Sequence, residues 1–107
     1  MKYAMLLASA MVLVSSYAGR AQEADVAAGE AYAEKVCAAC HAVLANENMS
    51  PLPQAPTFQS VADTPGMTEL ALTVWMQSSH PTMPNIMLKP DELRNVVAYI
   101  RSLDRKG

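Results

Sequence analysis

The sequence predicts an all-α fold built from three main helices and one long irregular loop. Apolar residues recur with helical spacing in segments 25–36, 68–78 and 90–103, and no segment has the alternation of a half-buried β-strand. Between the first two helices, residues 42–67 have no sustained period and contain four of the seven prolines. Loops of this length are normally functional or disordered, and we interpret this one as a wrapping segment.

The first 21 residues are predicted to be a targeting signal rather than part of the fold. Lys2 gives a positive start, and the apolar run 4–14 is shorter than the ~20 residues that a membrane span needs. This pattern is typical of a secretory signal peptide that is cleaved after a small residue. We expect cleavage after Ala21, with Ala18 as the alternative, so that residues 22–107 form one mature domain without a membrane span.

The mature domain is predicted to be acidic and small. Loss of Lys2 and Arg20 would leave six of the eight Lys and Arg residues against ten Asp and Glu, a formal net charge near −4. Nucleic acid selects basic surfaces, so it is not an expected partner. A domain of this length makes a thin core by itself, and a bound apolar group would help to fill it.

The first predicted helix begins at Asp25, whose carboxylate can cap the positive helix end. It leads into the motif C-A-A-C-H at residues 37–41, a spacing typical of covalent haem attachment. Cys37 and Cys40 can each form a thioether with a haem vinyl group, and His41 can be an axial ligand of the iron. Helical spacing puts both sulfur atoms on one side of a turn, next to His41.

Other interpretations of the motif are a redox dithiol, a disulfide and a zinc site. Redox dithiols of this type occur near a βαβ pattern, which we do not find in this sequence. A zinc site would need His80 as well as His41, which is outside the usual finger spacing. A simple disulfide would leave His41 without a role, so haem attachment is the preferred interpretation.

The loop 42–67 supplies candidates for contacts with the haem. Leu52, Phe58 and Val61 could cover one edge of it. Pro56 is a candidate to accept the second ring N–H of His41 through its carbonyl group, which would fix the tautomer and make the ligand more basic. The alternative, in which Pro56 only stiffens the loop, has similar weight on the residues alone.

The second predicted helix, 68–78, begins with Thr68 as a possible cap. Apolar residues occur on both of its sides, which predicts a helix packed between two partners. Trp75 is the only tryptophan, and its indole N–H needs a partner if it is buried. That partner could be a haem propionate, although packing in the core with a wet edge is the commoner role.

Residues 80–88 contain the candidates for a second iron ligand. Pro81 and Pro84 prevent a regular helix there and stiffen the arm that carries Met83. A methionine is more often a filler of core gaps, but a covalent haem with one free face makes a ligand role for Met83 attractive. His80 and Met87 are the competing candidates.

The last predicted helix, 90–103, has the strongest pattern. Pro90 suits the first helical position, although Lys89 stands where a polar cap is usual. A regular apolar stripe runs along the helix through Leu93, Val96, Val97, Ile100 and Leu103.

These features together resemble the class I c-type cytochromes of bacterial type. The resemblance rests on Gly29, the 37–41 motif, Pro56, Met83-Pro84 and the last helix, and it covers nearly all of the mature domain. It implies a helical bundle around one covalently attached haem c, with the first and last helices crossing near Gly29 and Tyr99. It also implies that Pro56 supports the axial His41, that His41 and Met83 bind the iron, and, more loosely, that Trp75 contacts a propionate.

The function that this resemblance implies is that of a periplasmic carrier of single electrons. Such a protein is not an enzyme, works as a monomer and meets redox proteins such as a dehydrogenase, an oxidase or another cytochrome. Two alternatives stay open. One is a haem enzyme or gas-binding cytochrome with an open sixth iron position, and the other is a dedicated electron-accepting subunit of a dehydrogenase.

Overall fold

The computed structural model describes residues 23–78, 83–84 and 86–106, and the predicted signal peptide and His80 lie outside this part. The described residues form α-helices and one short 3-10 helix, with no β-strand among them, which confirms the all-α prediction. No helix in this part is long and apolar enough to cross a membrane. In chain order the elements are α1 (Val26–Val36), η2 (Cys37–Ala39), α2 (Phe58–Ala62), α3 (Glu69–Gln77) and α4 (Pro90–Ser102).

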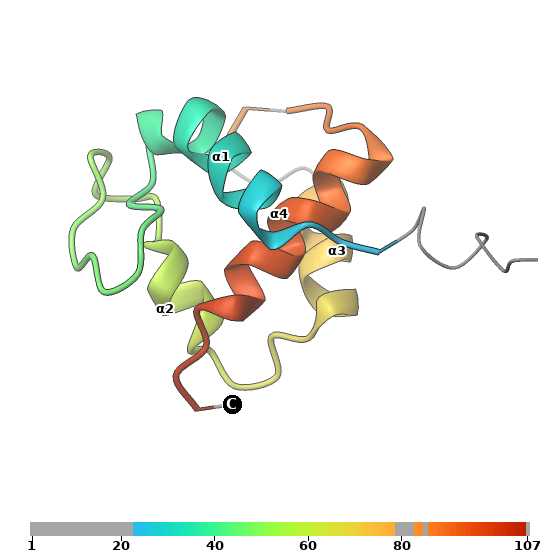
Figure 1. Ribbon diagram of the computed structural model, residues 1–107. Helices are drawn as coiled ribbons and strands as arrows, with labels where there is room; N and C mark the ends of the chain where they lie inside the picture. Colours follow the sequence, from blue (N-terminus) through green and yellow to red (C-terminus); the bar gives the residue numbers. More distant parts are fainter. Residues whose placement is uncertain (1–22, 79–82, 85, 107) are drawn as a thin grey trace, which may run out of the picture.

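The helices α1 and α4 cross in close contact at the centre of the molecule (Figure 1). The crossing point is Gly29, where an added Cβ would lie 2.9 Å from the Cβ of Tyr99 and closer still to the carbonyl oxygen of Asn95. A side chain at this position would therefore force the two backbones apart. Asp25 caps α1 as predicted, because its Oδ1 accepts a hydrogen bond from the Ala28 N–H at 3.0 Å.

Helix α4 supplies more buried apolar residues than any other described element, as its stripe predicts. Its N-terminus lacks the usual polar cap residue, and the Glu92 carboxylate instead accepts the Lys89 N–H at 2.9 Å. On the side that faces the core, five residues of the helix are buried: Leu93, Val96, Val97, Tyr99 and Ile100.

A short helix, α2, lies within the stretch that the sequence predicts to be irregular. Thr57 begins it, and its hydroxyl accepts a hydrogen bond from the Ser60 N–H at 3.0 Å. Phe58, Gln59 and Ala62 are buried on one side. The loop 42–67 therefore has one ordered turn that fixes its second half against the core.

Helix α3 differs from the prediction in its packing. Leu72 is buried, but Leu70 and Val74 are 73% and 54% exposed. Among the described elements α3 packs against α4 alone, and the side that carries Leu70 and Val74 has no partner element there.

Candidate functional site

A cavity of about 640 Å³ lies between the end of α1, the loop that contains α2, and the helices α3 and α4. Its wall is mainly apolar and includes Leu52, Phe58 and Val61, the residues expected to cover one edge of a haem. The six residues predicted to form the site all line this one cavity: Cys37, Cys40, His41, Pro56, Trp75 and Met83.

The two cysteines are presented by the tight turn that follows α1. The amide N–H groups of Cys40 and His41 both donate to the carbonyl oxygen of Cys37, at 3.1 and 2.9 Å. Cys37 is buried, Cys40 is partly exposed, and the two sulfur atoms are not joined in a disulfide. Burial raises the pKa of the Cys37 thiol to about 11, so it is a neutral thiol at pH 7.

His41 is oriented by the backbone of the loop. Its Nδ1 lies 2.7 Å from the carbonyl oxygen of Pro56. A carbonyl oxygen can only accept, so Nδ1 carries the proton and Nε2 keeps its lone pair for another partner. The ring of Phe58 packs against the imidazole with 5.4 Å between ring centroids. The Phe58 N–H donates to the Ala42 carbonyl oxygen at 2.9 Å, which joins the two segments a second time.

The three candidates for a second ligand differ in their surroundings. Met83 is partly buried and, with Pro84, lines the cavity. Met87 is 92% exposed and is not part of the cavity wall. His80 lies outside the described residues.

Trp75 lies on the cavity wall and is 57% exposed. The core packing considered for it is therefore wrong, and the side chain instead forms part of the boundary of the cavity. Leu72 and Met76 of the same helix also line this boundary.

Sequence reasoning did not identify several residues of the cavity wall. Met67 and Met76 are two of them, and in a chain with eight methionines no local pattern distinguished these two from the others. Ile86 also lines the cavity, although nothing in its sequence context indicated such a role. These positions depend on how the chain folds back over α4.

The donors in the cavity fit a covalently bound haem. Two thiols, an imidazole with one free nitrogen and a thioether surround an apolar space, and these are the groups that attach haem and ligate its iron. A cytochrome c family profile matches residues 26–104, which includes every residue of this site. The chain belongs to the cytochrome c family.

The match to a named relative extends over most of the protein. Over 93 residues this cytochrome c is 34% identical to cytochrome c-552 of Bradyrhizobium diazoefficiens, an alignment that covers 87% of this chain and 88% of the relative. No solved structure matches significantly. As a cytochrome c, the protein attaches haem c covalently and transfers electrons, which decides against the zinc and dithiol interpretations of the motif.

Proposed function

We propose that this cytochrome c is an exported carrier of single electrons whose haem iron is held by His41 and Met83. The observation that carries the proposal is that Cys37, Cys40, His41 and Met83 line a single apolar cavity. When bound, haem supplies an iron that changes between Fe(III) and Fe(II) by one electron.

The role of His41 follows from its hydrogen bond to the loop. Because Nδ1 donates to the Pro56 carbonyl oxygen at 2.7 Å, Nε2 is the nitrogen available to the iron. The same hydrogen bond holds the ring at a fixed angle and makes Nε2 a better electron donor to the iron when haem is bound. Pro56 thus acts as a support for the ligand in addition to stiffening the loop.

The role of Met83 distinguishes a carrier from an enzyme. A thioether ligand fills the sixth position and raises the reduction potential, because it favours Fe(II). The mostly apolar wall has the same effect, since it disfavours the extra charge of Fe(III). Trp75, on the wall of the cavity, is suited to donate its indole N–H to a haem propionate.

Carbon monoxide binding to the reduced protein tests this proposal. The wild-type protein should not bind carbon monoxide at neutral pH, because both axial positions are filled. Met83→Ala should bind it, whereas the control variant Met87→Ala, which changes an exposed side chain, should behave as wild type. Binding by the wild-type protein would instead identify a haem enzyme or a gas-binding cytochrome.

The expected partners are redox proteins such as a dehydrogenase, an oxidase or another cytochrome. The protein should act as a monomer and bind them weakly and transiently, as is usual for electron-transfer complexes. A dedicated subunit of one dehydrogenase would behave differently, since it would co-purify with that enzyme. Size-exclusion chromatography of the native extract separates the two cases: elution at monomer size supports the free carrier.

Export to the periplasm is the remaining part of the proposal. The apolar run 4–14 supports it, and the mature chain should begin at Gln22. Intact mass spectrometry of the periplasmic protein checks this directly. Retention of residues 1–21 in haem-loaded protein would contradict it.

A further inference from the structure

We propose that Gln59, Asp63 and Arg105 are positioning residues for His41, which they hold in place through α2. Together with Asn46 and Leu103 they form what we name the C-terminal clamp. The proposal rests on His41 being the axial ligand, as proposed above. Residues that lie outside the haem cavity would thus influence the reduction potential of the haem iron.

The need for a clamp arises from the length of α2. A helix of five residues has almost no stability of its own, because nucleation is unfavourable and few hydrogen bonds repay it. Its position must therefore be set by contacts with the rest of the molecule. Phe58 provides an apolar contact, and the clamp provides the polar ones.

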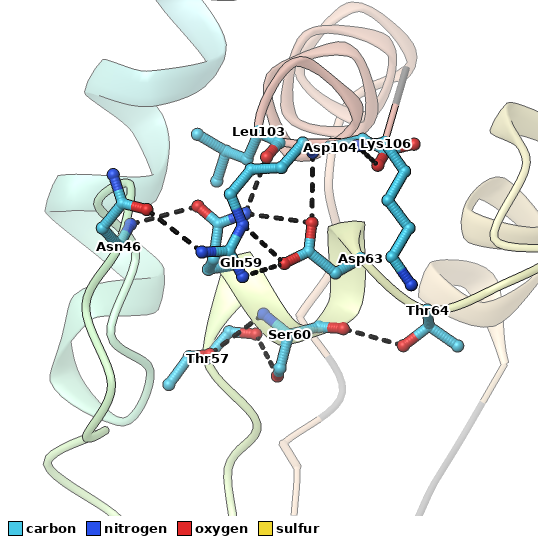
Figure 2. Close-up of polar contacts among 10 residues, drawn as sticks. Asn46, Thr57, Gln59, Ser60, Asp63, Thr64, Leu103, Asp104 and Lys106 are labelled. Atoms are coloured by element: carbon cyan, nitrogen blue, oxygen red, sulfur yellow. Dashed lines mark hydrogen bonds and ion pairs between the residues drawn. The ribbon is translucent and has the colours of Figure 1, made fainter.

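Gln59 is the buried centre of the clamp, at 5% exposure (Figure 2). Its Nε2 donates to the Leu103 carbonyl oxygen at 2.7 Å and to Asp63 Oδ1 at 3.2 Å, and its Oε1 accepts the Asn46 N–H at 3.0 Å. These partners require this orientation of the amide, since two of them only accept and the third only donates. One side chain thus joins α2 to the end of α4 and to the first half of the loop.

Arg105 closes the clamp from the C-terminal end. Its Nε and Nη2 donate to Asp63 Oδ2 at 3.0 and 2.5 Å, and its backbone N–H donates to Asp63 Oδ1 at 3.2 Å. Charge-assisted hydrogen bonds of this kind are both strong and directional. Asp63 is the C-cap residue of α2, so the bonds fix the end of that helix.

The other end of α2 is joined to His41. Pro56 and Thr57 directly precede the helix, the Pro56 carbonyl oxygen accepts from His41 Nδ1, and the Phe58 N–H donates to Ala42. A displacement of α2 would therefore move the Pro56 carbonyl oxygen away from the imidazole. The clamp keeps this hydrogen bond short and so keeps His41 a good electron donor to the iron.

The direction of the effect on the reduction potential distinguishes positioning from simple protection of the haem. A weaker bond to Pro56 makes His41 a poorer donor, which disfavours Fe(III) and raises the potential. A merely looser fold would admit water to the haem, which favours Fe(III) and lowers the potential.

The experiment compares Arg105→Met with the matched control Arg101→Met in the haem-loaded protein. Both arginines are exposed, but among the described residues the one ion pair of Arg101 is with Glu69 on α3, at 3.9 Å. Arg105→Met should raise the reduction potential and speed exchange of the His41 Nδ1 proton, followed by NMR of the reduced protein, by about fivefold. In Arg105→Lys the potential and the exchange rate should lie between those of Arg105→Met and wild type. In Arg101→Met both should equal the wild-type values.

Two outcomes would overturn the clamp while leaving His41 ligation intact. One is an unchanged potential and exchange rate in Arg105→Met, and the other is a lowered potential, which would indicate water entry. If NMR of the wild-type protein identified a different axial ligand, both the ligation by His41 and the clamp would be wrong.

Discussion

Single atoms decide how closely α1 and α4 approach each other. Gly29 has no Cβ, and the space where one would lie is taken by the Asn95 carbonyl group and the Tyr99 side chain. Tyr99 is in turn fixed by its hydroxyl, which donates to the Val43 carbonyl oxygen at 2.6 Å. Val43 is two residues from His41, so this crossing also positions the start of the loop beside the haem ligand.

Replacement of Gly29 by alanine should destabilise the protein, even though alanine has a higher helix propensity than glycine. Alanine in a helix is favoured over glycine by about 1 kcal/mol, but the overpacked crossing should cost ~1–3 kcal/mol. Urea unfolding of the haem-loaded variant measures the difference. The control Ala31→Gly, on the exposed side of the same helix, calibrates the propensity term, and a Gly29→Ala protein more stable than wild type would contradict the tight crossing.

At the scale of elements, the contact between α2 and the C-terminal residues should depend on pH. The hydrogen bonds from Arg105 hold the pKa of the Asp63 carboxyl below its usual range. A lowered pKa in the folded state means that the carboxylate stabilises the fold above the ordinary pKa of about 3.9, and that this contribution is lost as the pH falls through the lowered value.

Asp63→Asn should therefore be less stable than wild type at neutral pH. The difference should begin to shrink at about pH 4 and should go on shrinking as the pH falls through the lowered pKa of Asp63, because the wild-type carboxyl then becomes protonated and loses its charge. Urea unfolding of the two haem-loaded proteins across a pH series measures this difference. A gap that stays constant down to acid pH would show that the charge of Asp63 has no part in it.

The elements also differ in how far the sequence could predict them. The helices α1 and α3 follow from caps and apolar spacing that are visible locally, and α4 follows from Pro90 and its apolar stripe. The observed ends of all three lie close to the predicted ones. Helix α2 could not be predicted, since five residues contain little more than one turn of any period. The clamp joins Asn46 to Arg105, and no local pattern connects residues so far apart.

The site was easier to predict than the fold around it. The spacing of Cys37, Cys40 and His41 is a chemical requirement of haem attachment and is visible in the amino-acid sequence itself. The surroundings of Met83 and Met87 were not visible, because exposure depends on the fold of the whole chain. The cavity wall contains Met83 but not Met87. The prolines beside Met83 had favoured it over Met87 as the candidate ligand.

At the scale of the whole molecule, the protein has little core besides its haem cavity. The buried apolar residues come mainly from α4 and from the residues that pack against it, and the cavity of about 640 Å³ lies beside this cluster. A chain of this length that lacks its apolar filling has too small a core to be stable. Attachment of haem and folding should therefore be coupled.

Cys37→Ala and Cys40→Ala should each reduce the yield of haem-loaded protein sharply, because each removes one of the two covalent attachments. Haem staining after denaturing electrophoresis with thiol present measures the attached cofactor. Met49→Ala, which changes a side chain that is 86% exposed, is the control and should retain the full yield. Full haem retention in the cysteine variants would contradict attachment through these sulfur atoms.

Our central proposal is that His41 and Met83 fill both axial positions of the haem iron, which makes the protein an electron carrier. Its most direct test is the long-wavelength sulfur-to-iron absorption band of the oxidised protein, recorded for wild type, Met83→Ala and Met87→Ala. We predict the band in wild type and in Met87→Ala and its loss in Met83→Ala. A band that persists in Met83→Ala would move the ligand to another methionine, and its absence from the wild-type protein would contradict methionine ligation altogether.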